Sequence, residues 1–323
     1  MFPIRCALLF VLGAVAVSNA AQLKWRQNEQ TSLLELSFNN KPVLAWSFAS
    51  NQFKPYIKSL HALTGENILL DAPADHLHHH GLMYAIRING VNFWEERDQP
   101  GHEKHIEWLR TTASTTSSGV SQASATELIH WVTHTNAELR DTKPVALLIE
   151  RRSIDVAIDE SQGEVALRWR SDFQVGRTPV KLHGSDYNGL GLRLPPAWDH
   201  KARHQNSEKL GYSSEQKWDV LPARWTAVSH NAGDREITVA LFGSPSNRGT
   251  RMFFSMLNPF AYLAVTQNLS TQPIEYAPGE KFQLDYVLLV YSRPVTSGQI
   301  EQRYAKWLSE NVSSSAPATA PTP

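Results

Sequence analysis

The chain has 323 residues, with 31 basic and 31 acidic side chains, and therefore no formal net charge at neutral pH. This balance argues against nucleic acid and anionic membrane surfaces as partners. The only cysteine, Cys6, lies near the start, so the rest of the chain has no disulfide, thiolate metal site or cysteine nucleophile.

The first residues have the pattern of a secretory signal peptide. Arg5 precedes an apolar run, Cys6–Val17, which is followed by small residues at Ser18 and Ala20. We expect residues 1–20 to be a cleaved signal and the mature protein to be periplasmic or secreted. The apolar run is too short for a permanent span, and no later stretch reaches about 18 uninterrupted apolar residues, so we expect a soluble protein with no membrane span.

Most of the remaining apolar pattern predicts short β-strands, because β-branched and aromatic residues alternate with polar ones between Gly, Pro, Asn and Asp. The expected strands are Leu33–Phe38, Val43–Phe48, Leu82–Ile88, Leu128–His134, Val145–Ile149, Ile154–Ile158, Val165–Trp169, Leu190–Leu194, Ile237–Phe242, Met252–Met256, Tyr262–Val265 and Leu284–Val290. Strands of this number and length imply a sandwich or a barrel, and of the two we expect a mostly β fold that is a large antiparallel β-sandwich.

The turn Pro278–Gly279 leads into the last expected strand. This segment resembles a turn in the large β-sandwiches of sugar mutarotases and some polysaccharide lyases, so the resemblance implies a mutarotase-like supersandwich. No internal repeat or break in composition marks a second domain, and we expect a single domain over residues 21–312.

One helix is predicted near the C-terminus. Ile300, Tyr304, Trp307 and Leu308 fall on one helical face, behind Ser297 as the expected N-cap, and this face is expected to pack across the sandwich. The tail 313–323 has no apolar residue larger than alanine or proline, so we expect it to be disordered.

Histidines are concentrated in one part of the chain. Seven of the 13 lie in residues 61–105, and four of these fall in the run Asp75–Gly81. If this run is extended, His76, His78 and His80 project to one face and Asp75 and His79 to the other. The glycine that ends the run permits close approach of the backbone before the next strand.

Imidazoles beside a carboxylate suit two kinds of chemistry. They can hold a divalent metal ion, or act as an acid/base pair near neutral pH. We take His76, His78 and His79 as candidate catalytic groups, and Asp75, His78 and His79 as a candidate metal set. The alternative for any one histidine is a surface residue, or a core residue bonded to the backbone.

Asn89–Gly90 is a hairpin signal, and we expect Val91–Glu96 as the return strand. This strand would bring Trp94, with Glu95 or Glu96, back towards the histidines. An indole beside a carboxylate suits a sugar, because the sugar ring stacks on the indole while the acid takes a hydroxyl group or a proton. Trp94 is therefore a candidate substrate-binding residue and Glu95 a candidate catalytic one.

Several motifs along the chain support a resemblance to a known family. They are Lys54–Ile57, Asp75–Leu82, Asn89–Trp94, Asp186–Arg193, Arg224–Trp225 and Ser244–Asn247. Together they resemble a secreted bacterial family carried under the legacy label "methane oxygenase PmoA", a PmoA-like family of undefined activity that is often encoded near sugar-degrading functions. The resemblance implies export and a carbohydrate context. The label does not fit physically, because the methane-oxidising subunit of that name is an integral membrane protein.

This chain departs from the pattern of that family at two places. Leu77 stands where proline is common after the first histidine, and His80 stands where arginine is common before the glycine. A role for an arginine at that place therefore does not carry over to this chain.

Other candidates lie outside the histidine run. Tyr56 is expected to assist catalysis, and Arg193 is a candidate catalytic group that would stabilise developing negative charge. Because Arg193 is set among leucines, it must pair with a carboxylate or bind an anionic group such as a uronate if it is buried. His80, Asp186 and Asn247 are candidate substrate-binding residues.

These observations favour an exported carbohydrate-active enzyme, a lyase, hydrolase or epimerase, that uses the histidines as acid/base groups or metal ligands. The alternatives are a non-catalytic glycan-binding β-sandwich and a metal-dependent oxygenase with a His/Asp ligand set. The expected partner is a carbohydrate or another small polar ligand. The substrate, the reaction, the presence of a metal and the oligomeric state stay open.

Overall fold

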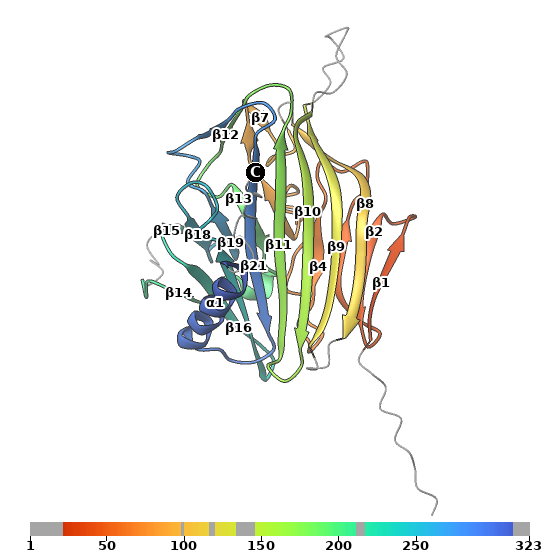
Figure 1. Cartoon of the computed structure of the whole chain (residues 1–323). Coiled ribbons are helices and arrows are strands. Elements are labelled where there is room, and N and C mark those ends of the chain that lie inside the picture. Colours follow the sequence, from red (N-terminus) through yellow and green to blue (C-terminus); the bar gives the residue numbers. More distant parts are fainter. Residues whose placement is uncertain (1–21, 98–99, 116–119, 134–145, 211–216, 313–323) are drawn as a thin grey trace, which may run out of the picture.

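The computed structural model describes residues 22–97, 100–115, 120–133, 146–210 and 217–312 (Figure 1). The predicted signal peptide, residues 1–20, and the predicted tail, residues 313–323, lie outside these residues. No helix in the described ranges is long and apolar enough to cross a membrane.

Nine strands form the first sheet, which carries the candidate site. In spatial order they are β1 (Leu23–Asn28), β2 (Leu33–Phe38), β3 (Lys41–Ser47), β4 (Tyr56–Leu60), β5 (Leu82–Ala85), β13 (Gly189–Arg193), β19 (Tyr262–Thr266), β18 (Met252–Met256) and β15 (Trp218–Leu221). Neighbouring strands run antiparallel throughout.

Eight strands form the second sheet and four form a small third one. The second sheet has the order β14 (Arg203–Asn206), β16 (Trp225–Ala232), β17 (Arg235–Gly243), β21 (Lys281–Tyr291), β11 (Glu164–Val175), β10 (Ala146–Asp159), β9 (Ser121–Val132) and β8 (His102–Thr115). The third has the order β20 (Ile274–Tyr276), β12 (Val180–His183), β6 (Arg87–Ile88) and β7 (Val91–Asn92). A short 3-10 helix spans Pro196–Trp198.

The two large sheets pack face to face around the main core (Figure 1). Alternating burial along β9 and β10 turns one side chain in two inward, as a half-exposed sheet requires. Tyr84 on β5 meets Trp131 on β9, with ring centroids 6.0 Å apart across the core. The predicted mostly β, antiparallel sandwich is confirmed.

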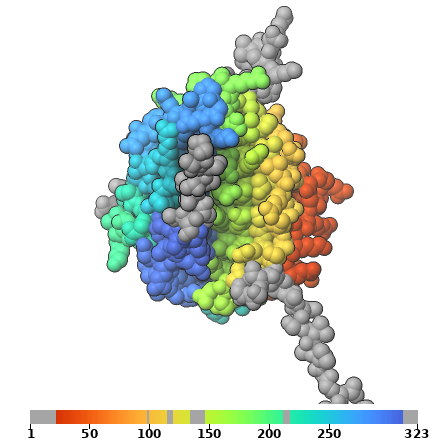
Figure 2. Space-filling view, viewed as in Figure 1, coloured from red at the N-terminus to blue at the C-terminus, as the bar shows by residue number. Residues whose placement is uncertain are grey.

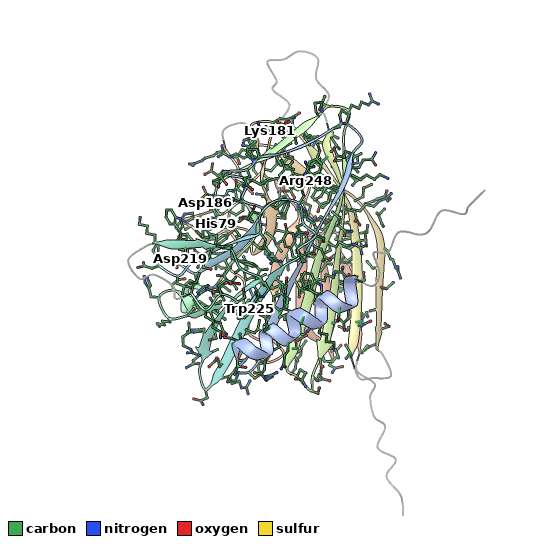
Figure 3. All side chains as sticks on the ribbon, turned by 60° about the vertical axis from the view of Figure 1, so that its left-hand side comes forward. His79, Lys181, Asp186, Asp219, Trp225 and Arg248 are labelled. Atoms are coloured by element: carbon green, nitrogen blue, oxygen red, sulfur yellow. The ribbon has the colours of Figure 1, made fainter. Side chains whose placement is uncertain are left out.

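The helix α1 (Ser297–Val312) packs against the outer face of the eight-stranded sheet. Figure 2 shows it in dark blue beside the green and yellow strands. Ile300, Tyr304 and Trp307 are buried against residues such as Phe242, as predicted. The helix also anchors Trp225 of β16, whose Nε1–H donates to Glu301 Oε2 at 2.6 Å; Figure 3 labels this tryptophan beside the helix.

The N-cap of α1 is Thr296, one residue before the predicted Ser297. The Thr296 hydroxyl accepts the backbone N–H of Gln299 (3.3 Å), and the Gln299 side chain accepts the backbone N–H of Thr296 (3.0 Å). This reciprocal pair is a capping box. The Ser297 hydroxyl instead donates to Gln205 Oε1 at 2.6 Å.

We expect Thr296→Ala to lower the free energy of unfolding by about 1 kcal/mol, because it removes the capping oxygen. Thr296→Ser keeps that oxygen and should retain most of the stability. Urea denaturation of both variants and the wild type measures the difference. Equal stability of the alanine and serine variants would contradict this assignment of the cap.

A buried ion cluster lies on the inner face of the eight-stranded sheet. The fully buried Arg152 donates to Glu150 (Nε–Oε1 2.9 Å and Nη2–Oε2 2.8 Å), to Glu103 Oε2 (2.9 Å) and to the carbonyl oxygen of Pro55 (2.8 Å). Its guanidinium also lies 4.6 Å from the ring centroid of Trp169. The cluster joins β10, β8 and the segment that leads into β4 through the centre of the sandwich.

Candidate functional site

The outer face of the nine-stranded sheet carries its own apolar cluster, separate from the core between the sheets. Strand register places Arg193 opposite Tyr262, Tyr262 opposite Met256, and Met256 opposite Trp218. Paired residues of neighbouring strands point to the same face. These side chains therefore form a row across the sheet from β13 to its edge strand β15.

A pocket of about 530 Å³ opens over part of this row, within the usual size of small-molecule sites. It is lined by Asp75, His76, His78, His79, Trp94, Glu95, Arg97, Tyr187, Lys217, Trp218, Phe254, Met256, Pro259, Phe260 and Tyr262. In Figure 3, His79 lies at the left of the molecule, away from the yellow strands β8 and β9 at the right.

The histidine run forms two successive turns and is not extended, so the condition for His76, His78 and His80 to share one face is not met. The backbone N–H of His76 donates to Pro73 O and that of His79 to His76 O, both at 2.9 Å. The turns gather His76, His78 and His79 at the pocket, whereas an extended chain would have sent His79 to the opposite face.

Gly81 closes this loop against β4. Its φ is +36°, and a Cβ atom there would lie 2.2 Å from the carbonyl oxygen of Ile57. Only glycine fits this approach without a shift of the backbone, which agrees with the role predicted for it.

The three rings at the pocket pack on one another. His76 and His79 stack with centroids 4.6 Å apart and an interplanar angle of 20°, and His78 meets His79 edge-on at 4.6 Å. Tyr262 stacks on His79 at 5.2 Å. Aromatic contacts therefore hold the imidazole planes in fixed positions.

Two of these histidines are neutral at physiological pH. Burial, together with the neighbouring histidines, lowers the pKa of His79 to about 2. Burial, with the nearby charge of Lys54, lowers the pKa of His78 to about 4. The His79 Nδ1 atom is buried and has no hydrogen-bond partner among the described residues. The pocket thus presents uncharged imidazoles that can accept or donate a hydrogen bond.

The predicted hairpin is present, but its return strand is shorter than expected. Asn89 (φ 52°) and Gly90 (φ 87°) form the turn that joins β6 to β7. Strand β7 ends at Asn92, whose Oδ1 accepts the backbone N–H groups of Trp94 and Glu95, both at 3.0 Å. These two hydrogen bonds take the place of strand pairing beyond Asn92 and turn Trp94 and Glu95 towards the pocket.

Trp94 and Glu95 both line the pocket. Trp94 is only 2% exposed and packs beside Tyr187, with centroids 5.4 Å apart, so its ring forms part of the inner wall. The Glu95 carboxylate is held by Arg87 Nη2 at 3.3 Å and Arg97 Nη2 at 3.2 Å.

A second polar network lies behind the histidine loop. His80 Nδ1 is 2.9 Å from Asp71 Oδ1, and His80 Nε2 is 2.9 Å from Glu96 Oε1. The buried Lys54 Nζ reaches the same Glu96 oxygen at 2.9 Å, and the Tyr56 hydroxyl donates to Asp71 Oδ2 at 3.1 Å. Burial lowers the pKa of His80, but the hydrogen bonds to Asp71 and Glu96 outweigh it and raise that pKa above its usual value.

This network places two predicted site residues outside the pocket. Tyr56 is 1% exposed, and burial raises the pKa of its hydroxyl far above the usual range. His80 is 7% exposed, and both its ring nitrogens are used by carboxylates. Both residues hold the histidine loop in place and do not line the pocket.

Three further predicted residues also do not line it. Arg193 is 3% exposed, with its guanidinium 3.6 Å from the ring centroid of Phe260 and Nη2 3.7 Å from Asp75 Oδ2. Asp186 accepts the hydroxyl of Ser270 at 2.6 Å. Asn247 bonds through its amide to the backbone of Asp285, with Nδ2–O at 3.1 Å and N–Oδ1 at 2.8 Å, which is a structural role.

The predicted metal set is not assembled as a ligand site. Across the described residues, no three His, Cys, Asp or Glu side chains are arranged to hold a metal ion. Asp75 Oδ2 lies 3.1 Å from His76 Nδ1, and His78 and His79 meet edge-on.

Sequence reasoning missed most of the aromatic wall. Tyr187, Trp218, Phe254, Phe260 and Tyr262 come from separate parts of the chain. The chain has 10 tryptophans, which is a signal for a stacking surface, but composition does not say which tryptophans besides Trp94 form it.

The fold and site define a β-sandwich protein with an aromatic, histidine-lined pocket on the outer face of one sheet. The chain belongs to DUF6807, a family of unknown function, whose model matches residues 33–305. No curated protein matches the sequence.

Solved structures similar to this chain include three carbohydrate-related proteins. One is the α-galactosidase from Lactobacillus brevis (9% identity, TM-score 0.46, covering 91% of this chain and 42% of that one). Another is a galactose mutarotase related enzyme from Lactobacillus acidophilus (11%, 0.38, 85% and 100%). The third is a putative aldose 1-epimerase from Klebsiella pneumoniae (10%, 0.41, 88% and 87%). This chain thus spans less than half the length of the galactosidase.

Proposed function

We propose that this protein is a carbohydrate-active enzyme that binds a sugar in the pocket and uses the histidines as acid/base groups. The observation that supports this most is one pocket that combines aromatic rings, uncharged imidazoles and a carboxylate. Aromatic faces suit the apolar side of a sugar ring, and the polar groups suit its hydroxyls. Epimerisation, elimination and hydrolysis all need proton transfer of this kind.

His78 is the best-placed proton acceptor of the three. It is half-buried and neutral, so its ring can accept a proton without first having to lose a proton. Glu95 and Glu96 favour its protonated form, and so would stabilise the imidazolium once it forms. His79 is more deeply buried and packed between rings, which suits a fixed hydrogen-bonding role towards the ligand.

We expect His78→Ala to lower turnover by about 100-fold or more while sugar binding changes little, because the base is lost and the aromatic wall remains. The measurement is kcat and KM on the sugar found by screening mono- and oligosaccharides for reducing-end, unsaturated or epimerised products. His130→Ala, a part-exposed histidine on β9 of the other sheet, is the control. Full activity of the His78 variant would contradict the proposal.

The second candidate function is non-catalytic glycan binding. It is favoured by the low pKa of His79, about 2, which makes that ring a permanent neutral hydrogen-bonding group. Under this alternative, wild-type protein binds glycans with no turnover of any screened sugar, and His78→Ala changes neither property.

We also propose that the protein is exported. The basic start, apolar run and small residues of the first 20 positions support this. The N-terminal sequence of protein recovered from the periplasm or the medium tests it. A mature chain starting near Ala21 is expected, and full-length protein retained in the cytoplasm would contradict it.

A further inference from the structure

Two tryptophans line the pocket at very different depths. Trp94 is 2% exposed and belongs to the inner wall, whereas Trp218 is 44% exposed. Few large apolar side chains in the described part of the chain are as open as Trp218. The exposed part of this indole is apolar surface in contact with water, which is unfavourable. A ligand that covered the ring beside the pocket would remove that surface from water.

The Trp218 ring is held in place by its neighbours. It is the first residue of β15, the edge strand of the sheet, and it stands opposite Met256 of β18. Its ring lies nearly parallel to that of Phe254, with centroids 6.1 Å apart and an interplanar angle of 29°. One side of the indole is therefore supported, and much of the remainder faces solvent.

We propose that Trp218 is an outer sugar-binding subsite, so that the ligand is an oligosaccharide with one unit in the pocket beside Trp94 and the next stacked on Trp218. This inference rests on the proposed function and names its substrate class. A pyranose ring has an apolar face that matches an exposed indole. Trp218 stacks on Phe254, whereas the three pocket histidines pack on one another. We therefore expect the contribution of Trp218 to binding affinity to depend on ligand length and not on the chemistry at His78.

The test is calorimetric titration of the full mature chain with glucose, galactose, xylose and galacturonate, and with their oligomers of two to four units. Wild-type protein should bind an oligomer at least about tenfold more tightly than its monomer. Trp218→Ala should lose this gain while its affinity for the monomer stays unchanged, and Trp218→Phe should keep part of it. Leu109→Ala, which removes an exposed apolar side chain from β8 of the other sheet, should behave as wild type.

The outcomes separate the two proposals. Monomer binding with no gain for longer ligands overturns the outer subsite and leaves the proposed function standing. A loss of monomer and oligomer affinity by the same factor in Trp218→Ala assigns the ring to the inner site, and also overturns the subsite. If no sugar binds to wild-type protein, the proposed function fails and the subsite fails with it.

Discussion

Replacing Arg152 by methionine is expected to lower the free energy of unfolding by about 3–5 kcal/mol, the usual cost of removing one partner from a buried ion pair. Methionine fills much of the space, so packing changes little. What is lost is the guanidinium that bonds to both Glu150 and Glu103, together with its bond to Pro55 O. Both carboxylates are buried and cannot turn to water.

The pH dependence of this variant separates charge from packing. Burial raises the pKa of Glu103 to about 8 even with Arg152 beside it, and removal of the guanidinium should raise it further. The folded variant then binds more protons than its unfolded chain, so its stability falls as pH rises. Because the wild-type value is already about 8, the two proteins differ in bound protons only above it, and urea denaturation should show a larger defect at about pH 9.5 than at about pH 6.5.

Arg151→Met is the matched control, because Arg151 is the exposed neighbour of Arg152 on the same strand. It should change stability by less than about 0.5 kcal/mol. A defect in Arg152→Met that is independent of pH would mean that packing, and not the charge, accounts for the loss.

Much of the sandwich could be predicted because many of its strands are short apolar or alternating segments rich in β-branched and aromatic residues. The ranges Leu33–Phe38 and Met252–Met256 match β2 and β18 at both ends. Strand β8 was missed because its sequence, HEKHIEWLRTTAST, is polar along an edge and carries register shifts between His105 and Glu107 and between Trp108 and Arg110. Two predicted strands extend to His134 and Val145, which lie outside the described residues.

The candidate site was predictable only where its residues are contiguous. His76, His78, His79 and Glu95 are close in sequence, and the turns and the hairpin bring them together. The aromatic wall depends on the register of β13, β19, β18 and β15, which join segments far apart in the chain. Local pattern cannot give that register, because it is set by tertiary pairing.

The local sequence pattern also could not predict which histidines line the pocket and which form ion pairs. His79 and His80 are adjacent, yet one faces the pocket and the other bridges two carboxylates. The deciding contacts, Asp71 and Glu96, lie nine residues before and sixteen after His80. Only the folded chain shows that one is a neutral pocket residue and the other an ion-pair partner.

Replacing His80 by glutamine is expected to destabilise the fold by about 2–4 kcal/mol, because two carboxylates lose the imidazolium between them. The sign of the pH dependence follows from the pKa shifts. The pKa of His80 is raised above 6.5, so its contribution is complete below pH 6.5 and is lost as pH rises through the folded-state value.

The partner carboxylate sets the acid limit of this contribution. Although burial alone would raise the pKa of Glu96, the bonds to His80 and Lys54 lower it from 4.5 to about 2, so its contribution is lost as pH falls from 4.5 through about 2. The stability difference between wild type and His80→Gln should therefore be largest between these limits, at about pH 5–6, and should shrink at about pH 9.

This variant also connects stability to the pocket. Asp71 and His80 bracket the histidine turns, and their bridge closes the loop that holds His78 and His79. In wild-type protein this bridge weakens as pH rises, so sugar binding should be weakest at high pH. The glutamine variant lacks the charged bridge and should bind sugar weakly at every pH. His130→Gln is the control for a histidine on the other sheet. A stability difference that stays constant between about pH 5 and 9 would mean that His80 acts through hydrogen bonding alone, without a charge.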